Sequence, residues 1–301
     1  MTMNIVRFIA LGAVSIAVGL ASAEVLVFED FESYSTTANL LQQWVPSNPA
    51  NPNGALVDET YTAQLTIAGG VEPVGARAFP SGGQGAVHLG SSVFEFSGLA
   101  SLGAPLVPTA SKSLQLDADI FDVGGIGNKR MSVGLRSTSP ANIVELAHYN
   151  SNSIGLAGRA NLFATTPAPD YFYYQLPLSL DRPNDSDSIT TTADLGEAWH
   201  HHRVTIGPDG ILYQIDLFRD GLDASTGSPG FDASTLFPLT PTAAGFNSLR
   251  FGGPSGISSS GNGVYGGVIF DNIRLAWVPE PTSAVMGLVA MAAISARRRG
   301  R

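Results

Sequence analysis

The chain has 301 residues, of which 16 are Lys or Arg and 25 are Asp or Glu, so its formal net charge is -9. A nucleic-acid-binding surface needs clustered Lys and Arg, and this balance argues against nucleic acid as a partner. No cysteine occurs, which excludes disulfides, thiolate metal sites and cysteine nucleophiles. The 34 glycines and 19 prolines favour short strands joined by turns over charged helices.

The N-terminal segment has the three parts of a secretory signal peptide. Arg7 supplies a positive charge, residues 8–20 form an apolar run, and Ala21-Ser22-Ala23 is a small-residue cleavage site. We therefore expect signal peptidase to remove residues 1–23 and leave a mature chain that starts near Glu24. The alternative is an uncleaved membrane anchor, for which the apolar run is short.

The C-terminal segment is an apolar run followed at once by arginines. Residues 282–296 form 15 positions without a charge, somewhat fewer than the roughly 20 that span a bilayer. The basic residues that follow are Arg297, Arg298, Arg299 and Arg301. Clustered arginine stays on the cytoplasmic side of a membrane, so this stretch predicts a stop segment with the body of the protein outside. Without Arg7 and these four arginines, 11 basic side chains face 25 acidic ones, so the body is acidic.

A short motif stands directly before the apolar run. Pro279-Glu280-Pro281, the run and the arginines together resemble the PEP-CTERM sorting signal of Gram-negative bacteria. The resemblance implies recognition by an exosortase, cleavage near the motif, and transient anchoring in the inner membrane. It also implies an exported protein of the cell envelope, the cell surface or the extracellular matrix, with residues 278–301 as its sorting segment.

Alternating apolar and polar residues dominate the stretch between these segments and predict an almost wholly β body. The stretch SLQLDADI places four apolar residues on one strand face: Leu114, Leu116, Ala118 and Ile120. The clearest hairpin is HRVTIGPDGILYQIDLF, with a turn at Pro208-Asp209-Gly210 in which Gly210 can take a positive φ. No internal repeat or long linker divides residues 24–277, which we expect to form one domain.

Three stretches of the body resemble the concanavalin A-like lectin/glucanase and laminin-G-like jelly rolls. They are VFEDFESYSTTANLLQQW near the start, WHHHRVTIGPDGILYQIDLFRDG in the middle and GVIFDNIRLAW at the end. The resemblance implies an all-β, two-sheet antiparallel jelly-roll sandwich over residues 24–277. In that fold the first and last strands lie together and close the sandwich.

The same resemblance raises the question of glycoside hydrolysis. Glycosidases of this fold use paired carboxylates on one strand, typically in an E-x-D-x-(x)-E run, and no such run exists here. Glu29 and Asp30 face opposite ways on a strand, and the alternation around Asp117 and Asp119 predicts the solvent face of an amphipathic strand. We therefore expect no catalysis. A divergent glycoside hydrolase and a purely structural envelope protein stay open as alternatives.

Two groups of residues bear on metal binding. His200 and His202 share a strand face while His201 points away, so at most two converge and zinc is not indicated. The loop DRPNDSD offers carboxylates that calcium accepts together with backbone carbonyls, although a solvated acidic loop is the alternative. These loop carboxylates belong to Asp181, Asp185 and Asp187. No other cofactor is expected.

An aromatic run suggests contact with sugar. In PDYFYYQL, Tyr171 and Tyr173 fall on one strand face and Phe172 and Tyr174 on the other. An exposed pair can stack on sugar rings, whereas a strand with aromatics on both faces is also typical of a buried sandwich strand. The resulting hypothesis is weak, non-catalytic contact with extracellular polysaccharide.

Overall fold

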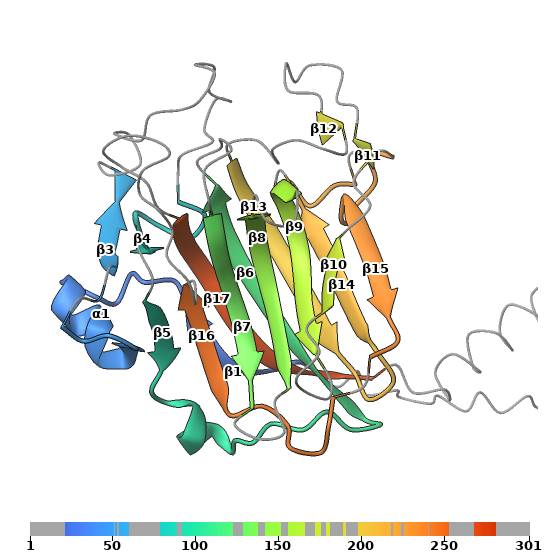
Figure 1. The fold of residues 1–301 in the computed structure, drawn as a ribbon, viewed down its shortest axis with the longest axis horizontal. Coiled ribbons are helices and arrows are strands. Elements are labelled where there is room, and N and C mark those ends of the chain that lie inside the picture. The colour runs from blue at the N-terminus through green and yellow to red at the C-terminus, as the bar shows by residue number, and fades with distance from the viewer. Residues whose placement is uncertain are drawn as a thin grey trace, which may run out of the picture.

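Two antiparallel β-sheets lie face to face and form the body of the protein (Figure 1). The computed structural model describes residues 22–50, 52, 54–59, 79–88, 92–122, 129–137, 142–151, 156–165, 172–175, 179–180, 189–190, 198–217, 219–223, 226–239, 241–252 and 268–280. This mostly β architecture confirms the two-sheet antiparallel sandwich predicted from the sequence and is consistent with a jelly roll.

The larger sheet has eight strands. In spatial order they are β15 (Ala233–Phe237), β14 (Ile211–Asp216), β13 (Ala198–Ile206), β6 (Lys112–Asp122), β17 (Val268–Pro279), β4 (Gln84–His88) and β3 (Gly54–Asp58), and β1 (Glu24–Glu29) also pairs with β17. Strands that are adjacent at the centre of this sheet, such as β6 and β17, are far apart in sequence, so the chain crosses between the sheets repeatedly.

The second sheet has seven strands and lies in front of the first in Figure 1. In spatial order they are β10 (Phe172–Gln175), β9 (Leu156–Thr165), β8 (Ile143–Ser151), β7 (Lys129–Arg136), β16 (Ser248–Gly252), β5 (Val93–Phe96) and β2 (Trp44–Pro46). A separate ribbon pairs β11 (Ser179–Leu180) with β12 (Ile189–Thr190). The helical elements in the described ranges are α1 (Thr37–Gln43) and the 3₁₀ turn η1 (Leu99–Leu102). Neither of these helices has the length or the apolar character that crossing a bilayer requires.

Alternation along the strands builds the core between the sheets. Leu114, Leu116, Ala118 and Ile120 on β6 are fully buried, as the sequence pattern predicts. The opposing sheet supplies buried residues at the same period, including Leu135 on β7. Each large apolar side chain buried in this way contributes about 2 kcal/mol, which is how a body without disulfides is held together.

The first and last strands lie side by side, as expected from the resemblance to the concanavalin-like jelly roll. β1 pairs antiparallel with β17 from Glu24 opposite Trp277 to Glu29 opposite Ile273. The chain therefore enters and leaves the sandwich at neighbouring points of one sheet.

The predicted hairpin forms between β13 and β14, with its turn at the predicted residues. Gly207 donates its N–H to the carbonyl of Gly210 at 2.9 Å. The positive φ that glycine allows is not used, since Gly210 is not among the residues with positive φ. Space constrains this position instead, since a Cβ at Gly210 would lie 3.0 Å from the carbonyl oxygen of Phe237.

A buried carboxylate organises the segment after β1. Glu29 accepts hydrogen bonds from the backbone N–H of Phe31 at 2.9 Å, the hydroxyl of Tyr34 at 2.6 Å and the indole N–H of Trp44 at 3.0 Å. The bond to Phe31 holds that residue at φ 59, where its ring reaches the core. Burial and the neighbouring Glu29 carboxylate raise the pKa of Tyr34, so its hydroxyl stays a donor.

We predict that Glu29→Ala lowers the free energy of unfolding by about 3 kcal/mol, because it leaves buried donors of Phe31 and Trp44 unpaired. Chemical denaturation monitored by tryptophan fluorescence measures this. The matched control is Asp30→Ala, since among the described residues the Asp30 side chain accepts only the exposed N–H of Glu32, at 3.2 Å. Equal losses in the two variants would show that Glu29 has no special role.

Candidate ligand-binding groove

One cross-strand row runs over the outward face of the seven-stranded sheet. By register, Val45 pairs with Glu95, Glu95 with Arg250, Arg250 with Gly134, and Gly134 with Glu145. The sequence neighbours of Arg250, Leu249 and Phe251, are buried in the core. Because side chains alternate across a strand, the row faces away from the core.

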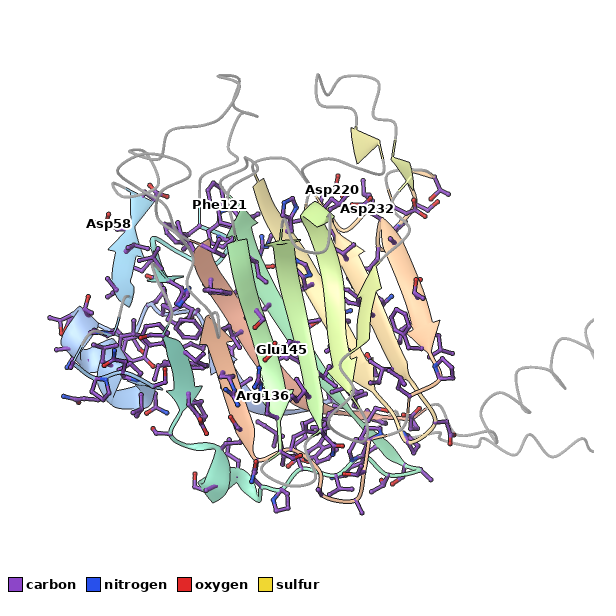
Figure 2. All side chains as sticks on the ribbon, viewed as in Figure 1. Asp58, Phe121, Arg136, Glu145, Asp220 and Asp232 are labelled. Atoms are coloured by element: carbon purple, nitrogen blue, oxygen red, sulfur yellow. The ribbon has the colours of Figure 1, made fainter. Side chains whose placement is uncertain are left out.

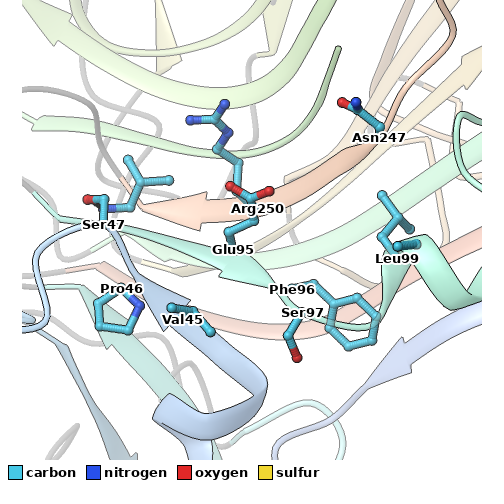
Figure 3. Close-up of a pocket in the computed structure, with 11 residues that line it drawn as sticks. Val45, Pro46, Ser47, Glu95, Phe96, Ser97, Leu99, Asn247 and Arg250 are labelled. Atoms are coloured by element: carbon cyan, nitrogen blue, oxygen red, sulfur yellow. Dashed lines mark hydrogen bonds between the residues drawn. The ribbon is translucent and has the colours of Figure 1, made fainter. Parts of the chain in front are cut away.

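A groove of about 400 Å³ opens over one end of this row (Figure 3). Strands β2, β5 and β16 form its floor, and the segment that follows β5 forms one wall. Its lining includes Val45, Pro46, Ser47, Glu95, Phe96, Asn247 and Arg250. The groove thus combines apolar surface with hydrogen-bonding groups of both kinds.

The two charges in the groove are neighbours that do not bind each other. Glu95 is exposed and pairs in register with Arg250, yet the described residues include no ion pair for either. Burial, and then the charge of Arg136, lower the pKa of Arg250. Its Nε atom is buried and has no hydrogen-bond partner among the described residues, and the same holds for Oγ of Ser248 on the same strand face.

The next charged pair along the row, Arg136 and Glu145, forms an ion pair. Glu145 accepts a hydrogen bond from Nε of Arg136 at 2.8 Å and a second from its Nη2, and Figure 2 shows the two residues on this sheet. The Glu145 side chain lies over Gly134, where an added Cβ would come within 2.5 Å of its Cγ. Glu145 is therefore held flat against β7, and its carboxylate is bound by arginine.

The register places the predicted aromatic strand beside β9. Tyr173 pairs with Phe163, which pairs with Glu145, and Tyr174 pairs with Leu162, which pairs with Leu146. The side chains of residues 172–175 lie outside the described part of the structure, as do Tyr171 and the loop aspartates Asp181, Asp185 and Asp187 in their entirety.

The outward face of the eight-stranded sheet corrects one prediction. Asp117 and Asp119 do share the face opposite the core, but they are buried and not solvated. Asp117 is bound by Arg203 through Nε and by Nη1 of Arg274 at 3.2 Å. Asp119 accepts from Nε of Arg219 and from Asn272, at 2.8 and 2.7 Å. Alternation gave the right face, while long cationic side chains from neighbouring strands covered the carboxylates.

Histidine completes this cluster. His201 on β13 pairs in register with Asp119 on β6, and its Nδ1 lies 2.7 Å from Oδ1 of Asp119. Although burial opposes it, the two aspartates raise the pKa of His201 to about 9. His200 and His202 point to the other face, as predicted, where their rings bind the carbonyl of Leu217 and the hydroxyl of Tyr213 at 2.8 Å. In the described ranges, no three His, Asp or Glu side chains gather to hold a metal.

The pKa values of two aspartates on this sheet, Asp271 and Asp117, are shifted in opposite directions. Burial raises the pKa of Asp271 to about 7, against the hydrogen bonds that it accepts from Ser81. The hydroxyl of Ser81 lies 2.8 Å from Oδ1 of Asp271. Hydrogen bonds and ion pairs with His201 and Arg203 lower the pKa of Asp117 to about 2, although burial opposes them.

Glu95 and Arg250 carry no sequence signal of a site. Each is a single charged residue between core residues, in VFEF and SLRF, and that pattern is typical of any half-buried strand. Only the pairing of β16 with β5 places them together.

No protein-family model matches this chain, and no curated protein does. Among solved structures, it is similar to domain 4 of AbnA, a GH43 extracellular arabinanase from Geobacillus stearothermophilus, solved with arabinotriose: 13% identity, 89% of this chain and 99% of that chain covered, and a TM-score of 0.40. It is also similar to the cellulose induced protein Cip1, with 15% identity, 83% and 96% covered, and a TM-score of 0.39. The T. cruzi calreticulin globular domain gives 11% identity, 87% and 90% covered, and a TM-score of 0.40.

We predict that Asp271 contributes a fall in the free energy of unfolding as the pH rises from about 4 to about 7, because folded Asp271 retains a proton that the unfolded chain has released. Burial lowers the pKa of His88 to about 4, which contributes an opposing rise between about pH 4 and 6.5, so the Asp271 contribution is measured as the difference between the parent and Asp271→Asn. The slope from Asp271 is at most roughly 1.4 kcal/mol per pH unit. His201 adds a second fall between about 6.5 and 9, since its folded pKa is raised.

Denaturation curves at stepped pH measure both slopes. Relative to the parent, Asp271→Asn should shift the slope between pH 4 and 7 toward a rise with pH, and His201→Asn should remove the fall above 6.5. The control is Asp209→Asn at the exposed tip of the β13–β14 turn, which should keep the slopes of the parent. Equal slopes between pH 4 and 7 in the parent and in Asp271→Asn would contradict this assignment.

Proposed function

We propose that this chain is an exported, exosortase-sorted protein of the cell surface or extracellular matrix, with a lectin-like, concanavalin A-like sandwich that contacts exopolysaccharide without catalysis. The observation that carries the proposal is the groove over β2, β5 and β16, in whose lining Arg250 and Glu95 are cross-strand neighbours that form no ion pair among the described residues. Charged groups that do not bind each other leave donors and acceptors available to ligand hydroxyls.

The composition of the groove suits a sugar. Saccharides present hydroxyls that both donate and accept, and the groove offers Glu95 as acceptor beside the donors of Arg250 and the amide of Asn247. Val45 is 45% exposed in the same lining and offers an apolar surface for ring CH groups.

A divergent glycoside hydrolase is the second candidate. The separation of the carboxylates in the row, and the ion pair that one of them forms, argue against it. Glu95 and Glu145 are separated by three strand spacings, about 14 Å between backbones. Paired carboxylates in these enzymes lie about 5 to 9.5 Å apart. Glu145 is also bound by Arg136, so its oxygens are engaged.

The sorting part of the proposal rests on the two terminal sequences, most of which lie outside the described residues. Pro279 ends β17, and the N–H of Glu280 donates to the carbonyl of Ser111 at 3.1 Å. The motif therefore starts where the sandwich stops. Pro281, the apolar run, Arg297, Arg298, Arg299, Arg301 and the cleavage residue Ala21 are outside the described part, while Ala23 directly precedes β1.

Arg250→Met is expected to weaken oligosaccharide binding about tenfold, the effect of losing one charge-assisted hydrogen bond, without loss of stability. Glu95→Gln should weaken it less, since the amide still accepts. Isothermal titration with hits from a glycan array, run with and without calcium, measures this. Lys112→Met is the matched control, because it removes an exposed cation on the other sheet. Unchanged binding by folded Arg250→Met would remove the groove from consideration.

Processing is tested separately. Produced in a host with an exosortase, the protein should start near Glu24 and end near Pro279, as measured by intact mass. A variant with Pro279→Ala, Glu280→Ala and Pro281→Ala should keep its tail. A parent that still ends at Arg301 under these conditions contradicts the sorting assignment and leaves the groove untouched.

A further inference from the structure

A second cross-strand row crosses the outward face of the eight-stranded sheet. Phe28 pairs with Arg274, Arg274 with Asp117, and Asp117 with Arg203, which continues to Gln214. We propose that Arg203 and Arg274 form an anion-binding surface on this face, and that its ligand is a carboxylate-bearing polysaccharide. This site is distinct from the groove, which lies on the outward face of the other sheet.

The guanidinium groups have donors to spare. Arg203 binds Asp117 through Nε, and Arg274 binds it through Nη1. Among the described residues no other hydrogen bond involves either side chain. Each guanidinium has five N–H donors, so most of them stay available to an oxyanion. The shared carboxylate fixes both heads in place, which lowers the entropy lost when a ligand binds.

Charge on this face is layered. The Asp117 side chain is 5% exposed, whereas those of Arg203 and Arg274 are 32% and 27% exposed. A ligand approaching from solvent therefore meets guanidinium before carboxylate.

The charged groups around Arg203 and Arg274 do not cancel the positive charge of this exposed layer. His201 lies 3.6 Å from Asp117 through Nε2, and its raised pKa keeps it protonated at neutral pH. Asp119 and Arg219 neutralise each other at 2.8 Å. Asp216 and Asp271 also lie on this face and are buried, and the raised pKa of Asp271 leaves it partly neutral. The exposed layer is positive although the chain as a whole is acidic.

The geometry favours a chain with repeated charges over a single small anion. Arg203 and Arg274 lie two strand spacings apart, about 9.5 Å between backbones, on an open sheet face. Aromatic rings flank them, since Phe28 is 56% exposed beside Arg274 and the Phe231 ring lies 5.0 Å from the Arg203 guanidinium. Sugar rings present apolar CH faces to such aromatics between their carboxylates.

Two binding faces on opposite sides of one sandwich would let the protein bridge polymer chains. The groove takes a hydroxyl-rich segment, and the arginine row takes an acidic one. This role rests on the proposed function for its setting, but the arginine row can be tested without the groove.

The probe is polygalacturonate, titrated against the full chain in low salt, with its methyl-esterified form as the neutral control. Asp117→Asn combined with Arg203→Gln and Arg274→Gln removes both cations without leaving a buried carboxylate unpaired, and should weaken binding at least tenfold. Asp117→Asn alone frees both guanidiniums and should strengthen binding severalfold. A purely structural ion cluster predicts no such gain. Raising the salt concentration should weaken binding of the parent, because the contacts are partly exposed.

The proposal is overturned if the parent does not bind polygalacturonate, if the triple variant binds it equally well, or if the esterified polymer is preferred. Binding of anionic phospholipid vesicles in place of polygalacturonate would assign the surface to a membrane and also overturn it. Arg250→Met separates the two faces, since it should leave polygalacturonate binding unchanged while weakening binding in the groove. Absence of groove binding in the parent, with polygalacturonate binding intact, would therefore contradict the proposed function and leave the arginine row standing.

Discussion

The pairing of β17 with β6 is the contact on which the rest of the sandwich depends. The last strand of the body pairs with β6 on one edge and with β1 and β4 on the other, so it lies inside the larger sheet and not at its border. This pairing joins residues more than 150 positions apart, such as Arg274 and Asp117. Until it forms, neither the inner core rows nor the outer ionic rows of this sheet exist.

A bulge within β17 decides what that pairing presents to solvent. The register shifts between Asp271 and Arg274, and Asn272 takes φ 48 at this point. In a regular strand, residues three apart face opposite sides. With one extra residue at the bulge, Asp271 and Arg274 both face outward while Phe270 and Ile273 stay in the core. The side chain of Asn272 then binds Asp119, so the bulge also fastens the ionic cluster.

The two outward faces solve the burial of charge differently. On the larger sheet, the buried carboxylates of Asp117 and Asp119 each have at least two partners, which is the condition under which burial of charge is tolerated. On the smaller sheet, Arg136 and Glu145 satisfy each other, whereas Nε of Arg250 is buried without a hydrogen-bond partner among the described residues.

The sequence by itself determined the strand content, the core face of each clear strand and the position of the main hairpin. Those features follow from the period of two, which local chain geometry imposes on Leu114 to Ile120 as on any strand. The closeness of the first and last strands was likewise predicted, through the resemblance of their motifs. The predictions of a signal peptide and a sorting segment at the two termini also rest on sequence alone.

Only the tertiary structure decided which strands are neighbours, and therefore which outward residues meet. Glu95 and Arg250 come together because β5 and β16 pair across 150 residues of chain, and nothing local in either strand signals this. Asp117 was expected to be solvated, because the alternation of apolar and polar residues predicts which side of the sheet a side chain is on. It does not predict which other side chains cover that side. The cover of Asp117 consists of Arg203 and Arg274, whose side chains reach it from strands that lie beside β6 in space and far from it in sequence. Alternation is a local property, whereas partners are set by the pairing of distant strands.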